Sequence, residues 1–173
     1  MGQDNIRASD RAAVVGVIDP DANTAGTLTT GWISMATWGR IMAIIMAGDL
    51  GSSATLDAKL EQAQDGAGTG AKDITGKAIT QLTQAGTDSN KQAIINVHRE
   101  ELDLVNGFTH VRLSHTVATA TSDSAAVVLG FDPRYNTAAD NDAATVDEDL
   151  AISALWATES SRAARHAHVD KNL

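Results

Sequence analysis

The stretch Ala54-Thr-Leu-Asp-Ala-Lys-Leu-Glu61 alternates apolar and polar residues one by one. Its even positions are Ala or Leu, and its odd positions are Thr, Asp, Lys and Glu. Successive side chains of a β-strand point to opposite faces, so a period of two predicts a strand with one buried and one wetted face. The stretch therefore predicts a β-sheet that covers a core on one side only.

The same character extends outward from this strand over most of the chain. Between Arg11 and Tyr135, short apolar runs alternate with clusters of Gly, Asp, Asn, Ser and Thr, which is typical of many short strands joined by turns. The further strands are expected at 13–18, 31–36, 40–46, 73–82, 92–99, 108–117 and 124–131. This pattern predicts a mainly β fold, an antiparallel β-sandwich or jelly-roll-like domain.

Two turn signals refine this expectation. Asp19-Pro20-Asp21 should end the first strand, because proline lacks the amide hydrogen that a β-ladder needs. Asn106-Gly107 is a strong hairpin signal, because both residues tolerate a positive φ. The strand that follows should place Val111, Leu113 and His115 on one face.

The last forty residues differ in composition, so we expect a β-sandwich domain over 1–135 and a linker with a C-terminal helical extension over 136–173. Thr145 and Glu148 form a capping box that predicts a helix start. Acids follow in the first turn, and Arg162 and Arg165 lie near the expected end, so both ends complement the helix dipole. The helix could dock on its own sandwich or reach a neighbour.

Composition limits the function classes. The formal net charge of −9 disfavours a direct grip on nucleic acid, which draws on clustered Lys and Arg. The chain has no cysteine, which excludes disulfides and thiolate chemistry. The apolar run 41–47 is far shorter than the ~20 residues of a membrane span, so no membrane contact is expected.

Several segments carry residues that are typical of catalytic or binding motifs, but their spacing does not match those motifs. The glycine-rich stretch 65–72 lacks the Ser or Thr that a phosphate loop needs after its lysine, so a hairpin loop is the better interpretation. The acids at 140–149 lack the glycine of a calcium loop, since Thr145 stands there. His110 and His115 should lie on opposite faces of one strand and cannot converge on a metal. We therefore expect no catalytic, cofactor or metal residues, and no enzyme.

The run Trp38-Gly-Arg-Ile-Met-Ala-Ile-Ile-Met46 is apolar on both faces of a strand. Such a strand must be covered on both faces, either as a central strand or by another subunit. Large apolar and aromatic side chains dominate protein interfaces, so the candidates for an interface are Trp32, Trp38, Ile41, Met42, Ile44, Met46, Leu150, Leu155 and Trp156. Burial of most of them in the domain's own core is the competing interpretation.

Several segments taken in order carry a family resemblance: Val17-Ile-Asp-Pro-Asp21, Thr30-Gly-Trp-Ile-Ser-Met35, Ala58-Lys-Leu-Glu-Gln-Ala63, Gly70-Ala-Lys-Asp-Ile-Thr-Gly-Lys77, Glu101-Leu-Asp103, Phe108-Thr-His-Val-Arg-Leu113 and Val127-Val-Leu-Gly-Phe-Asp-Pro-Arg-Tyr135. Together they resemble small virion proteins of tailed bacteriophages, especially siphophages of marine α-proteobacteria. The resemblance covers about 13–135 and leaves 145–173 unmatched.

This resemblance implies a capsid cement or decoration protein, made in the host cytoplasm and located on the capsid exterior of the virion. Its partners would be the major capsid protein and copies of itself, as a homo-oligomer such as a trimer. A head-tail connector or tail structural protein, and a non-catalytic β-sandwich binding module, are the alternative hypotheses. Hundreds of copies per particle would indicate the shell, whereas six or twelve copies would indicate the connector.

Overall fold

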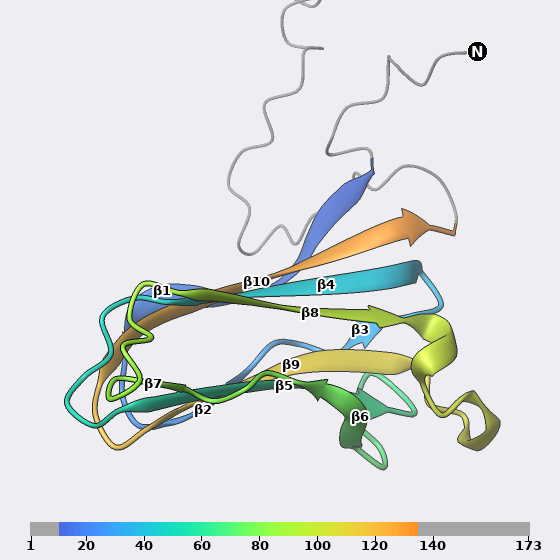
Figure 1. Cartoon of the computed structure of the whole chain (residues 1–173). Helices are drawn as coiled ribbons and strands as arrows, with labels where there is room; N and C mark the ends of the chain where they lie inside the picture. Colours follow the sequence, from blue (N-terminus) through green and yellow to red (C-terminus); the bar gives the residue numbers. More distant parts are fainter. Residues whose placement is uncertain (1–10, 135–173) are drawn as a thin grey trace, which may run out of the picture.

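A computed structural model gives the structure of the protein and describes residues 11–134. Two antiparallel sheets pack face to face (Figure 1). The first, sheet A, contains in spatial order β1 (Ala12–Asn23), β10 (Ser122–Pro133), β4 (Trp38–Ala47) and β8 (Gln92–His98). The predicted mainly β sandwich is therefore confirmed.

The second, sheet B, contains in spatial order β2 (Gly26–Thr29), β9 (His110–Ala118), β5 (Thr55–Ala63) and β6 (Lys72–Ala78). The short strands β3 (Ile33–Ser34) and β7 (Leu82–Thr83) pair with β9 and β5. Two 3₁₀ turns, η2 (Arg99–Glu101) and η3 (Leu104–Asn106), connect β8 to β9.

The strand order is that of a jelly roll. Without the short strands β3 and β7, the first strand pairs with the last (β1 with β10) and the second with the next to last (β2 with β9). The nesting continues inward with β4 beside β8 and β5 beside β6. Apart from the hairpin β5–β6, such nested pairs place successive strands in alternate sheets, and two Greek keys joined in this way form the eight-stranded double sheet of a jelly roll.

The core lies between the sheets. The even positions of β5 are buried and its odd positions are not, up to Glu61, as the alternation predicts. Val111, Leu113, His115 and Val117 of β9 point inward from sheet B, and Ile41, Ile45, Val97 and Val128 meet them from sheet A. The predicted inward faces of β5 and β9 are thus confirmed.

Proline does not end the first strand, so that prediction is wrong. β1 continues to Asn23, and its register against β10 shifts between Ile18 and Asp21, around Pro20. β1 is an edge strand, and an irregularity of this kind leaves the missing amide hydrogen of proline without consequence for the ladder.

The Asn106-Gly107 hairpin is also not formed. Asn106 ends η3, and Gly107 follows it in the left-handed conformation with φ 79°. The strands on either side pair elsewhere, β8 with β4 and β9 with β5, because consecutive strands of the jelly roll lie in different sheets. Of the two residues only Gly107 has a positive φ, and it ends a 3₁₀ turn.

Two expected strands are shorter than predicted. Of 31–36 only Ile33 and Ser34 pair with β9, and a turn follows them. Of 73–82, β6 ends at Ala78 and β7 pairs separately with β5. Gly76 has a φ of +76°, and the register of β6 against β5 shifts around it, which interrupts the ladder.

Candidate interaction surface

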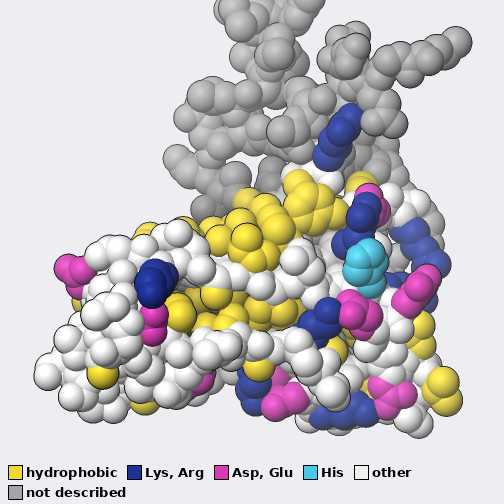
Figure 2. Space-filling model, in the orientation of Figure 1, with side chains coloured by type: hydrophobic (Ala, Val, Ile, Leu, Met, Phe, Trp, Pro, Cys, Tyr) yellow, Lys and Arg dark blue, Asp and Glu magenta, His cyan; other side chains and the backbone are white. Residues whose placement is uncertain are grey.

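The outer face of sheet A is apolar. Alternation along the strands points one set of side chains away from the core, and cross-strand pairing brings this set together. We call it the apolar face, and its members are Val14, Val17, Met42, Ile44, Met46, Ile94, Val127, Leu129 and Phe131. Figure 2 shows hydrophobic side chains gathered over this upper sheet.

A row of four residues crosses the middle of the apolar face. Val17 lies opposite Val127, Val127 opposite Ile44, and Ile44 opposite Ile94. β-Branched residues pack well as cross-strand neighbours, so the row forms one continuous ridge across all strands of the sheet. Ile94 on the edge strand is 58% exposed, which is unusual for an isoleucine.

The structure divides the predicted interface residues of β4. Met42, Ile44 and Met46 lie on the apolar face and are half-buried. Trp38 and Ile41 are instead 6% and 1% exposed and belong to the core. A side chain at Gly130 would meet the indole of Trp38, so the glycine makes room for the ring. These two residues offer no surface to a partner.

Trp32 lies elsewhere, at the hairpin loop between β5 and β6. It is half-buried, its ring is 4.5 Å from the Arg112 guanidinium, and a Cβ at Gly68 would collide with the ring. The cation–π contact and the close glycine fix the indole against the domain. Leu150, Leu155 and Trp156, together with the predicted helix, lie outside the described residues.

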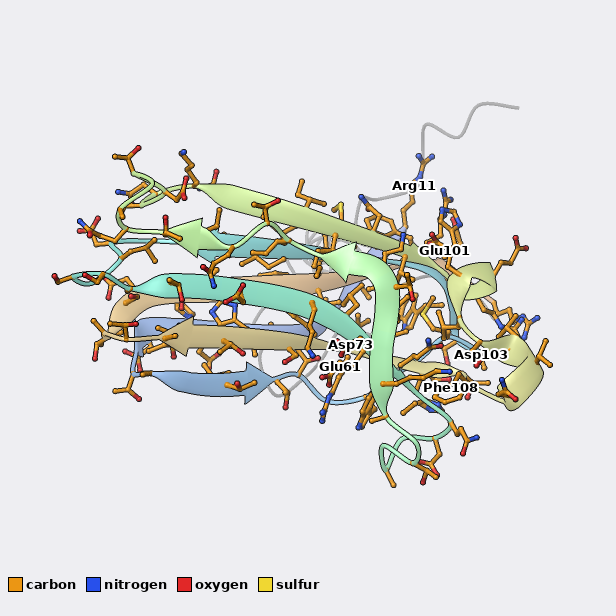
Figure 3. All side chains as sticks on the ribbon, turned by 60° about the horizontal axis from the view of Figure 1, so that its bottom comes forward. Arg11, Glu61, Asp73, Glu101, Asp103 and Phe108 are labelled. Carbon is orange, nitrogen blue, oxygen red and sulfur yellow. The ribbon has the colours of Figure 1, made fainter. Side chains whose placement is uncertain are left out.

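The outer face of sheet B is polar and charged. Arg112 donates to Glu61 at 2.8 Å, Lys59 to Asp73 at 2.6 Å, and the hydroxyls of Thr27 and Thr116 are 2.8 Å apart. The hydrogen bond and charge of Asp73 raise the pKa of Lys59. Figure 3 shows Glu61 and Asp73 on this side of the sandwich. The two outer faces are therefore chemically opposite.

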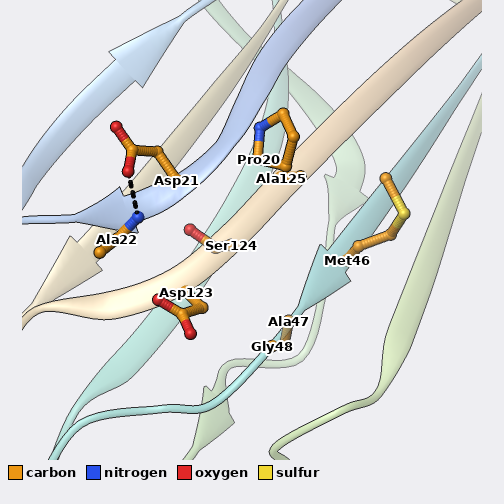
Figure 4. A pocket seen from close by; sticks show the side chains of 9 residues that line it. All are labelled: Pro20, Asp21, Ala22, Met46, Ala47, Gly48, Asp123, Ser124 and Ala125. Carbon is orange, nitrogen blue, oxygen red and sulfur yellow. Dashed lines mark hydrogen bonds between the residues drawn. The ribbon is translucent and has the colours of Figure 1, made fainter.

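A shallow depression of about 570 Å³ adjoins the apolar face where β1 bends around Pro20. It is lined by Pro20, Asp21, Ala22, Met46, Ala47, Gly48, Asp123, Ser124 and Ala125 (Figure 4). Asp21 and Asp123 make its rim acidic, whereas Met46 and Ala125 continue the apolar face. The depression forms the acidic end of that face.

The glycine-rich stretch 65–72 is a hairpin loop, as predicted. The Asp65 carboxylate accepts hydrogen bonds from the backbone of Ala67 and Thr69 and from the Thr69 hydroxyl. These bonds lower the pKa of Asp65, with Thr69 as the largest cause. The Asp65 carboxylate thus accepts hydrogen bonds from the loop amides that would otherwise be available to a bound anion.

His115 belongs to the interior. It is fully buried, and its Nε2 lies 3.0 Å from the Ser124 hydroxyl, which also accepts from the Asn23 amide. This contact joins sheet B to sheet A through the core. Burial lowers the pKa of His115, so the ring is neutral at pH 7. On the apolar side of its strand, a histidine is expected to be a hydrogen-bonded core or interface residue. The structure places His115 in the core, with Nε2 bonded and Nδ1 without a hydrogen-bond partner among the described residues.

Within residues 11–134, no group of three or more His, Asp or Glu side chains is arranged to hold a metal ion. The same part of the chain has no helix with the length and apolar character of a membrane span.

The sequence matches no protein-family model, and no curated protein matches it significantly. Among solved structures it is similar to a chain of infectious bursal disease virus, Gx strain, with 13% identity, a TM-score of 0.39 and coverage of 80% of this chain. It spans only 37% of that viral chain.

A chain of broad bean stain virus has 12% identity and a TM-score of 0.38, with coverage of 71% of this chain and 66% of the viral one. A family 35 carbohydrate binding module from an environmental isolate has 14% identity and a TM-score of 0.32, with coverage of 69% and 77%. At TM-scores this low, the similarities support no statement about function.

Proposed function

We propose that the protein is a non-catalytic structural component of a bacteriophage virion, a cement or decoration protein that binds the major capsid shell from outside. The observation that carries the proposal is the apolar face of sheet A. Contiguous apolar surface rimmed by charged residues is typical of a protein interaction site. The charged outer face of sheet B suits the solvent side of such a block.

Two further observations support the same role. Jelly rolls are frequent in viral capsid proteins, although the fold alone does not fix a function. The segments that resemble phage virion proteins cover about 13–135, which is nearly the whole sandwich of residues 11–134. The partners under this proposal are the major capsid protein and further copies of this chain.

Met42 and Met46 suit this role because methionine adapts its shape to a partner surface. Their neighbours Ile44 and Val127 are stiff at χ1 and lose little side-chain freedom on binding. An interface with rigid residues in its centre and adaptable residues around them can bind a capsid shell with little loss of side-chain entropy.

The test uses the full chain and expanded capsids that lack it. The protein should cosediment with the capsids in hundreds of copies per particle and raise the temperature at which they break open. Cofractionation with tails alone, or six or twelve copies at one vertex, would contradict the proposal and favour the connector.

A further inference from the structure

The apolar face has a size that limits what can cover it. Its rows run from Phe131 to Ala125 along β10, which is ~20 Å at ~3.3 Å per residue. Four strands spaced ~4.8 Å apart give a width of ~19 Å and an area of roughly 400 Å². A stable dimer buries ~800 Å² on each partner, so a second copy packed on this face alone would be too small an interface.

A single helix fits these dimensions better. A helix is ~10 Å across, so a helix laid along the strands would cover the two central strands of sheet A, where Val127 and Ile44 lie opposite each other. The sequence predicts a helix from Thr145, and its apolar residues, which do not form one tidy stripe, are Val146, Leu150, Ile152, Leu155 and Trp156. From 145 to 165 it would be ~31 Å long.

The chain leaves the sandwich beside this face. β10 ends at Pro133, which lies opposite Trp38 at one end of sheet A. The ten residues 135–144 can extend up to ~33 Å before the expected helix begins. This length is enough to reach every row of the apolar face. The expected helix can therefore lie on sheet A of the same chain.

Charges at the two ends of the face favour one direction, although Asp132 lies at the end where the chain leaves the sheet and Lys91 at the opposite end. Arg11, His98 and Arg134 lie at the end where the chain leaves, and Arg40 there forms an ion pair with Asp132. The opposite end carries exposed Asp19, Asp21 and Asp123. A helix antiparallel to β10 would bring its acidic first turn, Asp147-Glu-Asp149, to the basic end, and Arg162 and Arg165 to the acidic end.

We propose that residues 145–165 of the same chain dock on the apolar face of sheet A in the free protein, antiparallel to β10. The inference rests on the proposed function in one respect, because the capsid shell would take the same face and the segment must then leave it.

The absence of cysteine from the sequence makes disulfide trapping a clean test. The full-length double variant Met42→Cys/Leu150→Cys should oxidise to a crosslinked monomer that reverts with dithiothreitol. Thr29→Cys/Leu150→Cys is the matched control, since Thr29 is an exposed strand residue on sheet B. The crosslink rate should be at least tenfold higher for the first pair.

The polarity is tested by Met46→Cys/Leu150→Cys, which should crosslink more slowly than the pair with position 42. A second pair, Ile44→Cys/Ala154→Cys, allows for a small shift along the helix, because position 154 lies one turn after position 150 on the same side. Interchain dimers at low concentration, equal rates for the control, a preference for position 46, or no crosslink in either register would each overturn the proposal.

Capsid binding separates this inference from the proposed function. The oxidised form of Met42→Cys/Leu150→Cys should lose capsid binding, and reduction should restore it. If the crosslink forms and neither form binds capsids, the docked segment stands and the cement function fails. If no crosslink forms and the reduced protein binds, the function stands and the docked segment fails.

Discussion

The two outer faces of the sandwich share the same strand geometry and differ in what the strands display. On sheet A, the central row reads Val17, Val127, Ile44 and Ile94. On sheet B, the equivalent outward positions hold Arg112, Glu61 and Lys59, joined by ion pairs. A jelly roll needs only its inner faces to be apolar, so packing of the two sheets against each other does not account for the apolar outer face of sheet A.

Ile41 and Met42 are neighbours on β4 but lie on opposite faces of sheet A, so their substitutions compare the inner face with the outer one. Ile41→Ala should lower the free energy of unfolding by ~2–5 kcal/mol, because Ile41 is buried and leaves a cavity. Met42→Ala should lower it by less than ~1.5 kcal/mol, because Met42 is only half-buried on the outer face. Urea denaturation of both variants measures the difference, and equal losses would place Met42 in the core.

A glycine pair tests the close packing on the inner side of sheet A. Gly130→Ala should destabilise the fold by ~1–3 kcal/mol, because the added methyl group meets the Trp38 ring. Gly31→Ala is the control, since nothing lies within 4 Å of its added Cβ, and it should change stability by less than ~1 kcal/mol. Thermal unfolding of both variants gives their Tm values. A Tm unchanged by Gly130→Ala would contradict the packing of Trp38 against this glycine.

His115 links the inner faces of the two sheets and predicts a pH dependence. Its pKa is lowered by burial, so the unfolded chain binds a proton more readily than the folded one. Stability is then complete above the unfolded pKa of ~6.5 and falls with pH below it, by at most ~1.4 kcal/mol per unit.

Urea midpoints measured at pH 7.5, 6.5 and 5.5 should therefore decrease, and His115→Gln should flatten the profile whatever its effect at pH 7.5. An unchanged slope in His115→Gln would assign the acid sensitivity to other groups.

The ion pairs of sheet B should have the smallest effect. A double-mutant cycle on Arg112→Ala and Glu61→Ala should give a coupling of ~0.2–1 kcal/mol, because exposed pairs lose most of their energy to solvent and side-chain entropy. The coupling should weaken at high salt. A coupling above ~2 kcal/mol would mean that this face is as important for folding as the inner one.

The sequence predicts the inward side of a strand where the other side is polar. The alternation of 54–61 identifies the inward side of β5 without ambiguity. The run 38–46 is apolar on both sides, so its period of two cannot tell which side meets sheet B. Only the pairing with β10 and β8 assigns Ile41 to the core and Ile44 to the apolar face.

The remaining errors concern turns and strand ends. Pro20 and Asn106-Gly107 were assigned the commonest local role of their residue types, but an edge strand tolerates the first, and a 3₁₀ turn uses the second. The contribution of Val127 and Leu129 to the apolar face was missed, although the continuous apolar run 125–131 is a signal for a strand covered on both sides.

Under the proposed function, the apolar face of sheet A, and not the charged face of sheet B, binds the capsid shell. Ile94→Asp and Thr29→Asp are matched variants, since both replace exposed residues on edge strands, in sheet A and in sheet B. In a capsid cosedimentation assay, Ile94→Asp should weaken binding at least tenfold, while Thr29→Asp should bind like the wild type. Wild-type binding by Ile94→Asp together with loss of binding by Thr29→Asp would assign capsid binding to sheet B and overturn the proposed function.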